Sequence, residues 1–379
     1  MAMVRFEDVA TRVNTKEDRL NTDLEYYVGG EHVETGELKV SGRGLIKGAP
    51  LGPMFYFGFK PGDILFVTRN PHLRKSAMVD FRGICSEKTL VIATRDQHML
   101  SQRYLATVMQ SDDFWDFMEE NKSGSVNYFI NWSTLAEYEF DLPPIEEQRV
   151  LAEKLWAAND LKEKYKTLLA STDEMLKAKF REMFGDPDAN IHGYPVKQLS
   201  EVMYVERGGS PRPIGDYITT SDDGVNWIKI GDVTTEDVYI THTAEKIKKS
   251  GISKSRHVIP GDFLLSNSMS FGRPYILKID GYIHDGWLVL RDEDAIFNQV
   301  YLYSALSSEY SYASFSAMAS GSCVKNLNKD IAGQLKMVIP PRHIQDEYAS
   351  VFKSVEATKA ALKQSISDVE SVMRGLING

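Results

Sequence analysis

Two long stretches without glycine or proline constrain the fold of this chain more than any other feature. The first runs from Pro144 to Gly185, and the second begins after Pro341. In both, apolar residues recur every three or four positions, which predicts a long helix with one apolar stripe. At ~1.5 Å per residue the first helix would be roughly 60 Å long, more than one ordinary domain needs. We therefore expect each helix to cover the stripe of the other, the alternative being that each lies on its own domain.

The ends of the first helix are marked by residues that favour starts and stops. Pro144 is tolerated in a first turn, Glu146 and Glu147 suit the positive end of the helix dipole, and Gly185 before Pro187 is a stop signal. The stripe of this helix consists of Leu151, Leu155, Ala158, Leu161, Tyr165, Leu168, Met175 and Phe180. That of the second helix consists of Ile344, Tyr348, Val351, Val355, Leu362, Ile366, Val369, Met373 and Leu376.

The segments before the two helices repeat each other. Each contains short apolar runs typical of strands, such as residues 64–67 and 263–265, followed by an aromatic stretch that predicts helices, residues 102–119 and 299–319. Three marks recur in the same order about two hundred residues apart: KPGDIL and IPGDFL, KSGSV and SGSCV, FDLPP and MVIPP. Together with the helices, these marks indicate an internal duplication.

Composition sets the broad class of the protein. The chain has 379 residues, 42% hydrophobic and 26% charged, which predicts a globular protein of two domains. No apolar run is long enough for a membrane span, and the N-terminus lacks a signal-peptide core, so we expect a cytoplasmic protein with no membrane partner. The net charge of −9 argues against bulk coating of nucleic acid but leaves local basic faces open. Two cysteines in unmatched positions favour reduced thiols over a zinc cluster.

Three sequence segments resemble the specificity subunit of type I restriction-modification enzymes. They are LPPIEEQ at 142–148, KFREMFGDP at 179–187 and GYPVKQL at 193–199. The second helix opens with PPRHIQ, which departs from the acidic version. The resemblance covers essentially the whole chain.

The resemblance implies an α+β fold of pseudo-twofold form, with two similar strand-rich target-recognition domains joined by two long antiparallel helices. The expected division is residues 1–142 for the first recognition domain, 143–185 for the central spacer helix, 186–339 for the second recognition domain and 340–379 for the C-terminal helix. Each recognition domain would read one half of a bipartite site in double-stranded DNA. The helices would set the gap between the halves and dock two modification subunits.

The resemblance also implies that this chain is not itself an enzyme. The modification subunits would carry S-adenosylmethionine and methylate adenine, and a separate restriction subunit, a motor-nuclease, would use ATP with Mg²⁺. The sequence agrees, because it has no phosphate-binding loop and its histidines are dispersed. Asn70-Pro71-His72 lacks the second proline and the aromatic residue of an adenine methyltransferase motif, so we interpret it as a turn.

Candidate DNA-binding residues lie in polar loops at equivalent places in the two repeats. Reading base edges requires Arg, Lys, Asn, Gln or Ser on loops, with further cations on phosphates. The basic run from Lys246 suits phosphate contact. The candidates are Arg69, Asn70, Arg74, Lys75, Lys122, Ser123, Ser125, Asn127, Lys246, Lys248, Lys249, Asn267, Ser268, Arg273, Ser322, Lys325 and Asn326.

Three alternatives remain open at this stage. The aromatic stretches at 114–117 and 301–312 could stack bases, although we interpret them as domain core. The chain as a whole could be a scaffold whose two halves bind proteins, and a DNA reader differs from it by steep salt dependence. An uncharacterised hydrolase would need a catalytic cluster that the sequence does not reveal.

Overall fold

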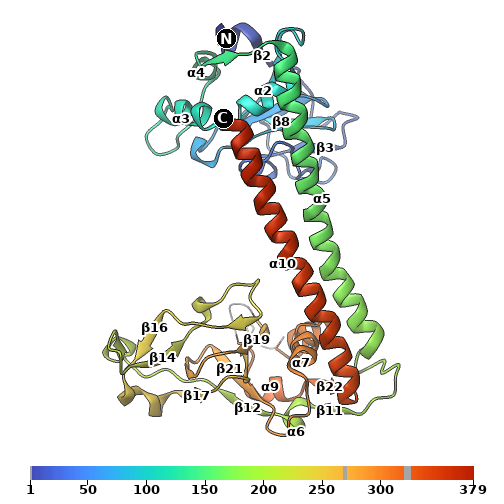
Figure 1. Cartoon of the computed structure of the whole chain (residues 1–379), viewed down its shortest axis with the longest axis vertical. Coiled ribbons are helices and arrows are strands. Elements are labelled where there is room, and N and C mark those ends of the chain that lie inside the picture. The colour runs from blue at the N-terminus through green and yellow to red at the C-terminus, as the bar shows by residue number, and fades with distance from the viewer. Residues whose placement is uncertain (1, 268–270, 320–325) are drawn as a thin grey trace. The chain divides into compact units, whose positions relative to one another are not determined.

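The computed structural model describes residues 2–267, 271–319 and 326–379, and these form two compact units. The N-terminal unit comprises residues 1–168 and 362–379, and the C-terminal unit comprises residues 169–361. Two long helices, α5 (Ile145–Phe184) and α10 (Arg342–Asn378), are labelled in green and red in Figure 1. Each helix passes from one unit into the other, so each unit contains a part of both.

The N-terminal unit contains two four-stranded sheets and one two-stranded sheet. The sheet orders are β2-β9-β6-β7, β4-β3-β8-β5 and β1-β10. Its strands are β1 (Ala2–Arg5), β2 (Ala10–Val13), β3 (Tyr26–Val28), β4 (Gly44–Leu45), β5 (Phe55–Phe59), β6 (Ile64–Val67), β7 (Ser76–Met78), β8 (Gly83–Ser86), β9 (Thr89–Thr94) and β10 (Glu139–Leu142). Its helices besides α5 and α10 are α1 (Phe6–Val9), η1 (Gly30–His32), η2 (Pro71–Leu73), α2 (Gln102–Val108), α3 (Asp112–Glu120) and α4 (Trp132–Ala136).

The C-terminal unit repeats this plan with one extra strand in each larger sheet. The sheet orders are β12-β21-β18-β19-β15, β13-β16-β14-β20-β17 and β11-β22. Its strands are β11 (Val196–Gln198), β12 (Tyr204–Arg207), β13 (Ile218–Thr219), β14 (Val225–Ile228), β15 (Tyr239–Ile240), β16 (Glu245–Ile247), β17 (Arg256–Val258), β18 (Phe263–Ser266), β19 (Pro274–Leu277), β20 (Gly281–Ile283), β21 (Trp287–Arg291) and β22 (Lys336–Val338). Its further helices are α6 (Leu199–Val202), η3 (Ile214–Asp216), η4 (Ile230–Asp232), η5 (Lys249–Lys254), α7 (Gln299–Leu306), α8 (Glu309–Met318) and α9 (Lys329–Gly333). The mixed helix and strand fold and its duplication agree with the sequence prediction.

The repeated Pro-Gly-Asp mark forms the same turn in both units. The Asp63 carboxylate accepts a hydrogen bond from the backbone N–H of Lys60 at 2.9 Å, and the Asp262 carboxylate accepts one from Ile259 at 2.9 Å. The glycine of each turn has a positive φ, 92° at Gly62 and 102° at Gly261, a conformation that favours glycine. The mark therefore recurs because the turn that feeds β6 and β18 requires it.

The glutamine of each Pro-Pro-x-x-x-Gln segment fastens the start of a long helix. The Gln148 side chain is buried, accepts from Ser101 N at 2.9 Å and donates to the carbonyl oxygens of Met99 and Pro143. Gln345 is equally buried and uses its oxygen for Asn298 N at 2.7 Å. The second segment lacks the acidic pair Glu146-Glu147 of the first segment. The hydrogen bonds at the start of the helix are nevertheless the same, because the glutamine side chain makes them.

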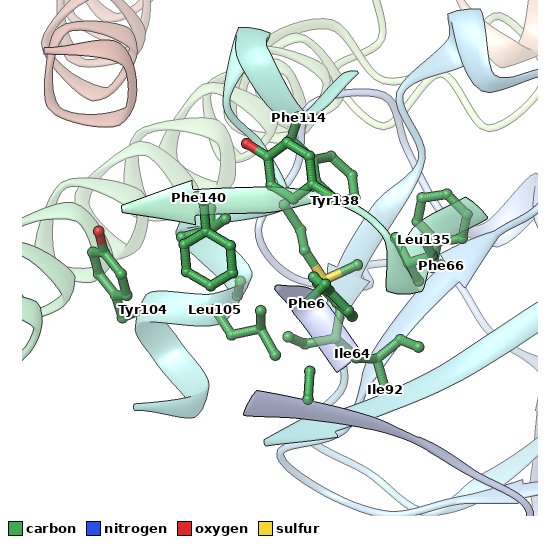
Figure 2. Packing of buried hydrophobic residues seen from close by; sticks show 14 of the residues in the cluster. Phe6, Ile64, Phe66, Ile92, Tyr104, Leu105, Phe114, Leu135, Tyr138 and Phe140 are labelled. Atoms are coloured by element: carbon green, nitrogen blue, oxygen red, sulfur yellow. The ribbon is translucent and has the colours of Figure 1, made fainter. Parts of the chain in front are cut away.

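The core of the N-terminal unit is built on aromatic residues from both strands and helices. Phe114 contacts Phe6 and Phe66 there, and it also contacts Tyr138, which directly precedes β10, as Figure 2 shows. Trp115 is fully buried and stacks on Phe66 at 5.5 Å between ring centroids. Most of the aromatic stretch is therefore core, as interpreted from the sequence, rather than a surface for base stacking.

The core of the C-terminal unit includes the end of α5 and the start of α10. Phe180 and Phe184 contact Tyr301 at 5.8 and 4.7 Å between ring centroids, and both also contact Tyr348 of α10. Tyr301 is buried, so this part of the second aromatic stretch is also core, whereas Tyr312 is exposed. In the N-terminal unit the partners are reversed, because the first part of α5 and the last part of α10 share one cluster through Trp156 and Met373. The two helices consequently run in opposite directions.

The buried face of α5 differs from the stripe expected from the sequence. Leu161, Leu168 and Met175 are 41%, 50% and 51% exposed, so the assignment of these three to the covered stripe is wrong. The buried residues in this central part of the helix include Asn159, Lys162, Thr172 and Leu176. The physical reason is that Lys162 points into the N-terminal unit, where its ammonium group forms an ion pair with Glu37 at 2.6 Å. The face of α5 that carries Lys162 is therefore the buried one.

Candidate nucleic-acid interface

In the N-terminal unit, the turn between β6 and β7 presents four candidate residues. Asn70 and Arg74 flank the 3₁₀ helix η2 and both have left-handed backbones, with φ of 53° and 48°. Pro71 is buried and anchors the turn, whereas the Asn70 side chain is exposed. The turn interpretation of Asn-Pro-His is confirmed, and the turn carries polar side chains outward.

A second candidate loop lies against this turn. Phe129 forms isolated bridges with both Arg69 and Ser123, and Asn70 N donates to Tyr128 O at 3.0 Å. The guanidinium of Arg69 lies over the Phe129 ring at 5.1 Å and donates to Asn127 O at 3.3 Å. The two segments chosen separately from the sequence, 69–75 and 122–127, therefore form one surface.

The cations of this surface are held in defined positions by nearby groups. Arg74 pairs with Asp112 and with Asp116 of α3, the second at 3.4 Å. Lys75 donates to the carbonyl oxygen of Gly30 at 2.7 Å. Lys122 pairs with Glu119 at 2.6 Å and lies over the Tyr128 ring at 4.5 Å. Ser125 and Asn127 are exposed and Ser123 is half-buried.

The C-terminal unit joins its equivalent segments by the same backbone bond. Leu327 N donates to Asn267 O at 2.8 Å, as Ile130 N donates to Thr68 O at 2.9 Å in the N-terminal unit. Asn267 is only 3% exposed, and its side-chain amide donates to Asp285 O at 2.7 Å. The Asn267 side chain therefore supports the loop that carries Asp285. Arg273 is half-buried and Asn326 exposed, whereas Ser268, Ser322 and Lys325 lie outside the described residues.

The basic run lies on β16, η5 and β17. Lys248 Nζ donates to Asp216 O at 2.7 Å, and Lys254 Nζ to the Tyr217 hydroxyl at 2.8 Å. Lys248 and Lys249 are exposed, and Lys246 on β16 is half-buried. The exposed ammonium groups of Lys248, Lys249 and Lys254 form a cationic edge suited to phosphate contact.

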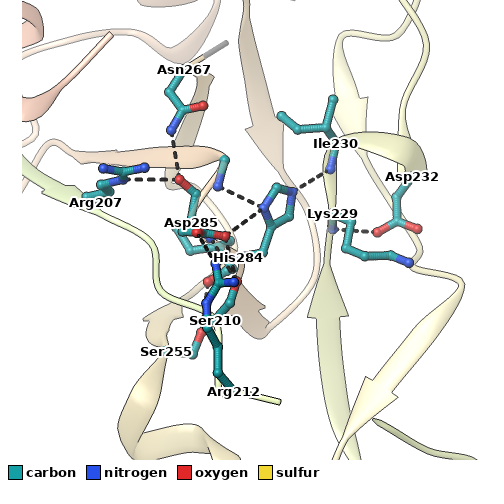
Figure 3. A network of polar contacts seen from close by, with 12 residues as sticks. Arg207, Ser210, Arg212, Lys229, Ile230, Asp232, Ser255, Asn267, His284 and Asp285 are labelled. Atoms are coloured by element: carbon teal, nitrogen blue, oxygen red, sulfur yellow. Dashed lines mark hydrogen bonds and ion pairs between the residues drawn. The ribbon is translucent and has the colours of Figure 1, made fainter. Parts of the chain in front are cut away.

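A polar network centred on Asp285 adjoins this edge and was missed by the sequence reasoning. Figure 3 shows that side chains from two other segments, residues 207–212 and Asn267, converge on Asp285. Its carboxylate accepts from Ser210 Oγ at 2.7 Å and from Arg212 Nη2 at 3.0 Å, and its carbonyl oxygen accepts from Arg207 Nε at 3.1 Å. The hydrogen bond from Ser210, assisted by the charge of Arg212, holds the pKa of the Asp285 carboxyl below its usual range. A Gly-Gly-Ser-Pro-Arg-Pro loop after a strand is the sequence signal that would have indicated this site.

His284, the residue before Asp285, is held in place by two backbone N–H groups. Backbone N–H groups of Gly286 and Ile230 point at its Nδ1 and Nε2 at 2.8 and 2.9 Å. A neutral imidazole accepts at one nitrogen and a protonated one at neither, so this setting favours the neutral ring. Burial accordingly lowers the pKa of His284, against the pull of the Asp285 carboxylate.

Other chemistry is not visible in the part of the chain that the structure describes. Residues 2–267, 271–319 and 326–379 contain no group of three or more His, Cys, Asp or Glu side chains placed to hold a metal ion. None of the helices in these ranges is both long and apolar enough to cross a membrane. Burial raises the pKa of the Cys85 thiol to about 12, so this side chain is an inert part of the core.

Comparison with known proteins adds a family match over part of the chain and a shared fold. Residues 192–371 match the family described as "Type I restriction modification DNA specificity domain". The whole fold is similar to a chain solved in a study of "complex assembly and conformational transition of the type I R-M system", with 20% identity, a TM-score of 0.66, and coverage of 99% of this chain and 96% of that chain. It is also similar to the "Type-I restriction-modification system S subunit from M. genitalium", with 15% identity, a TM-score of 0.57, and coverage of 99% and 94%. At these identities the likeness to the two structures shows the fold.

Proposed function

We propose that this chain is a DNA specificity subunit of a type I restriction-modification system, and that each of its two units reads one half of a split DNA site. The match of residues 192–371 to the family of type I restriction-modification DNA specificity domains supports this proposal. The observation that carries this proposal is that the frame of the matched segment is built twice. The Pro-Gly-Asp turn and the buried glutamine occur in both units, and the strand order of the N-terminal sheets recurs in the C-terminal unit with one extra strand in each larger sheet. A duplicated reader suits two half-sites.

Within this proposal the long helices set the gap between the half-sites and dock two modification subunits. The restriction subunit completes the complex. S-adenosylmethionine, ATP and Mg²⁺ would then be bound by those subunits, and this chain would contribute sequence recognition without methyl transfer or cleavage. A protein that works on chromosomal DNA beside such enzymes would act in the cytoplasm.

The test is a methylome of cells that express this chain with its modification subunits. Adenine methylation at a bipartite motif, two short specific halves around a gap of fixed length, is the expected result. Methylation at one unbroken motif would contradict reading by two units. The purified chain alone should show neither methyl transfer nor cleavage, and activity of the isolated chain would contradict the division of labour.

Domain exchange separates the two readers. Replacing residues 1–142 by a recognition domain of different specificity should change one half of the motif and leave the other unaltered. Lengthening α5 between Leu151 and Lys179 should change the gap while both halves stay the same. If the chain is instead a protein-binding scaffold, its affinity for DNA will lack the steep fall with rising salt that phosphate contacts require.

A further inference from the structure

The loop from Arg207 to Pro213 in the C-terminal unit lies directly on the backbone of the sheet beneath it. A Cβ atom on Gly208 would overlap the carbonyl oxygen of His284, and one on Gly209 would lie 2.7 Å from the carbonyl oxygen of Lys254. Their own N–H groups donate to Trp287 O at 2.9 Å and Ile283 O at 3.2 Å. Only glycine fits this close approach, so the pair fixes where the following Arg212 emerges.

The side chain of Arg212 is exposed, but an ion pair holds its guanidinium group in place. Its side chain is 78% exposed, and Nη2 donates to the Asp285 carboxylate at 3.0 Å. Asp285 is itself fixed by Ser210 Oγ at its carboxylate and by Asn267 at its carbonyl oxygen. The ion pair therefore rests on a support built from three separate segments of the chain, which a solvated surface arginine does not need.

The cationic edge beside the loop differs from Arg212 in its electrostatics. Lys248 and Lys254 donate to neutral oxygens, Asp216 O and the Tyr217 hydroxyl, so these hydrogen bonds do not offset their positive charge. The Arg212–Asp285 pair has no net charge and contributes little attraction to a phosphate backbone. What the carboxylate does supply is orientation, because a planar guanidinium held through one N–H still has other N–H groups to donate.

From this contrast we propose that Arg212 reads a base edge in the half-site recognised by the C-terminal unit, and that Asp285 is its positioning residue. The base class it fits is guanine, whose O6 and N7 accept a bidentate arginine in the major groove. The lysines of the basic run hold the neighbouring phosphates. This inference rests on the proposed function of the chain as a reader of a bipartite site.

The experiment measures binding of the full chain, with its modification subunits, to duplexes that carry the bipartite site and each single-base variant of it. Arg212→Ala should relax discrimination by about 5–150-fold at one base pair of one half-site. The slope of log affinity against log salt should stay near the wild-type value. Lys248→Ala should instead weaken binding to all duplexes alike and reduce that slope by about 0.9. Lys197→Ala, which removes a cation from the separate β11-β22 sheet, is the matched control and should do neither.

Asp285 is tested through its dependence on Arg212. Asp285→Asn should relax the same base pair, and the double variant Arg212→Ala/Asp285→Asn should be no worse than Arg212→Ala alone. Arg212→Lys should fail to restore discrimination, because an ammonium cannot make the two-pronged contact. Since Arg212 is exposed, Arg212→Ala is expected to fold normally, which circular dichroism checks.

Two outcomes would overturn the inference. A uniform loss of affinity with a smaller salt slope in Arg212→Ala would make the residue a phosphate contact, and unchanged discrimination would give it no role in reading. Both leave the proposed function standing, because the wild-type complex still reads two half-sites. A wild-type complex without sequence preference would overturn the proposed function and the inference together.

Discussion

The two units share a frame and differ in what is attached to it. In both, the Pro-Gly-Asp turn and the buried glutamine make the same hydrogen bonds, and a parallel strand pair, β3 with β8 and β14 with β20, recurs in the second large sheet. The surface arginines have different supports. Arg74, which follows strand β6, forms ion pairs with Asp112 and Asp116 of α3. Arg212, which follows strand β12, forms an ion pair with Asp285.

The same contrast appears on the long helices. Lys162 of α5 and Lys359 of α10 occupy the same position counted from the buried glutamines Gln148 and Gln345. Lys162 is 3% exposed and pairs with Glu37 of its own unit, whereas Lys359 pairs with Asp173 across the helix pair at 2.7 Å. The buried glutamines therefore make the same contacts in both copies, whereas residues that meet different neighbours, such as these two lysines, do not.

The largest expected effect comes from breaking the buried one of these two ion pairs. Glu37→Ala leaves the Lys162 ammonium buried without its partner, which should lower the free energy of unfolding by about 3–5 kcal/mol. Asp173→Ala, the matched change at a half-exposed carboxylate, should cost less than about 1 kcal/mol. Urea denaturation of the two variants measures both values. Equal costs would show that the two lysines are in equivalent surroundings after all.

The Glu37 pair also predicts a pH dependence. Burial opposes ionisation of Glu37, but hydrogen bonds from Lys162 and Lys166 outweigh it and hold the pKa of the carboxyl below its usual 4.5. A lowered carboxyl pKa gives stability that is fully present above 4.5 and is lost as the pH falls through the lower folded value. Glu37→Gln should therefore flatten the acid limb of the stability profile, and an unchanged limb would contradict the assignment.

A smaller effect, but an equal one in both units, is expected from the buried glutamines. Gln148→Leu and Gln345→Leu each leave backbone groups of the preceding chain without partners, which should cost about 1–3 kcal/mol. The matched exchange Glu147→Leu at the exposed first turn of α5 should change stability by less than about 0.5 kcal/mol. Thermal unfolding of the three variants tests whether the frame is as equivalent in energy as in geometry. A large cost for only one glutamine would break the comparison.

Substitution of Asn159 should raise the free energy of unfolding rather than lower it. It is buried in the N-terminal unit, and both polar atoms of its side chain lack a hydrogen-bond partner among the described residues. Asn159→Leu removes that desolvation cost and should raise stability by about 1 kcal/mol. Its counterpart in α10, Glu356, already pairs with Lys359 at 2.9 Å, so Glu356→Leu should give no such gain. Chemical denaturation compares the two, and a destabilised Asn159→Leu would mean that the amide is bonded in solution.

The sequence predicts the frame well because its determinants are local. A Pro-Gly-Asp turn, a glycine that ends α5 at φ 65° and an aromatic stretch of helical period each act through neighbours within a few residues. The duplication then allows each mark to be checked against its copy. The polar loops at 69–75 and 122–127 were located for the same reason, although nothing local indicated that they meet.

The Asp285 network could not be predicted because its members are distant in sequence. Arg212 and Asp285 are separated by 73 positions, and only the pairing of β12 with β21 and the placement of β20 bring their loops together. Asn267 shows the converse limit. Its residue type and its place after a strand favour reading of bases, yet the fold buries it as a support for the Asp285 loop.

The smallest expected effect concerns the helix stripe, where periodicity alone was misleading. Leu161 and Leu168 continue the apolar spacing of Leu155, but they face solvent in the N-terminal unit because Asn159 and Lys162 take the inward positions. Leu161→Ser should change the free energy of unfolding by less than about 0.5 kcal/mol, whereas Leu155→Ala at the buried position should cost about 2–5 kcal/mol. Denaturant midpoints of the two variants test whether the apolar stripe predicted from the sequence or the face buried in the structure is correct. A cost at Leu161 as large as that at Leu155 would restore the sequence-based stripe, and would require Lys162 to leave Glu37 in solution.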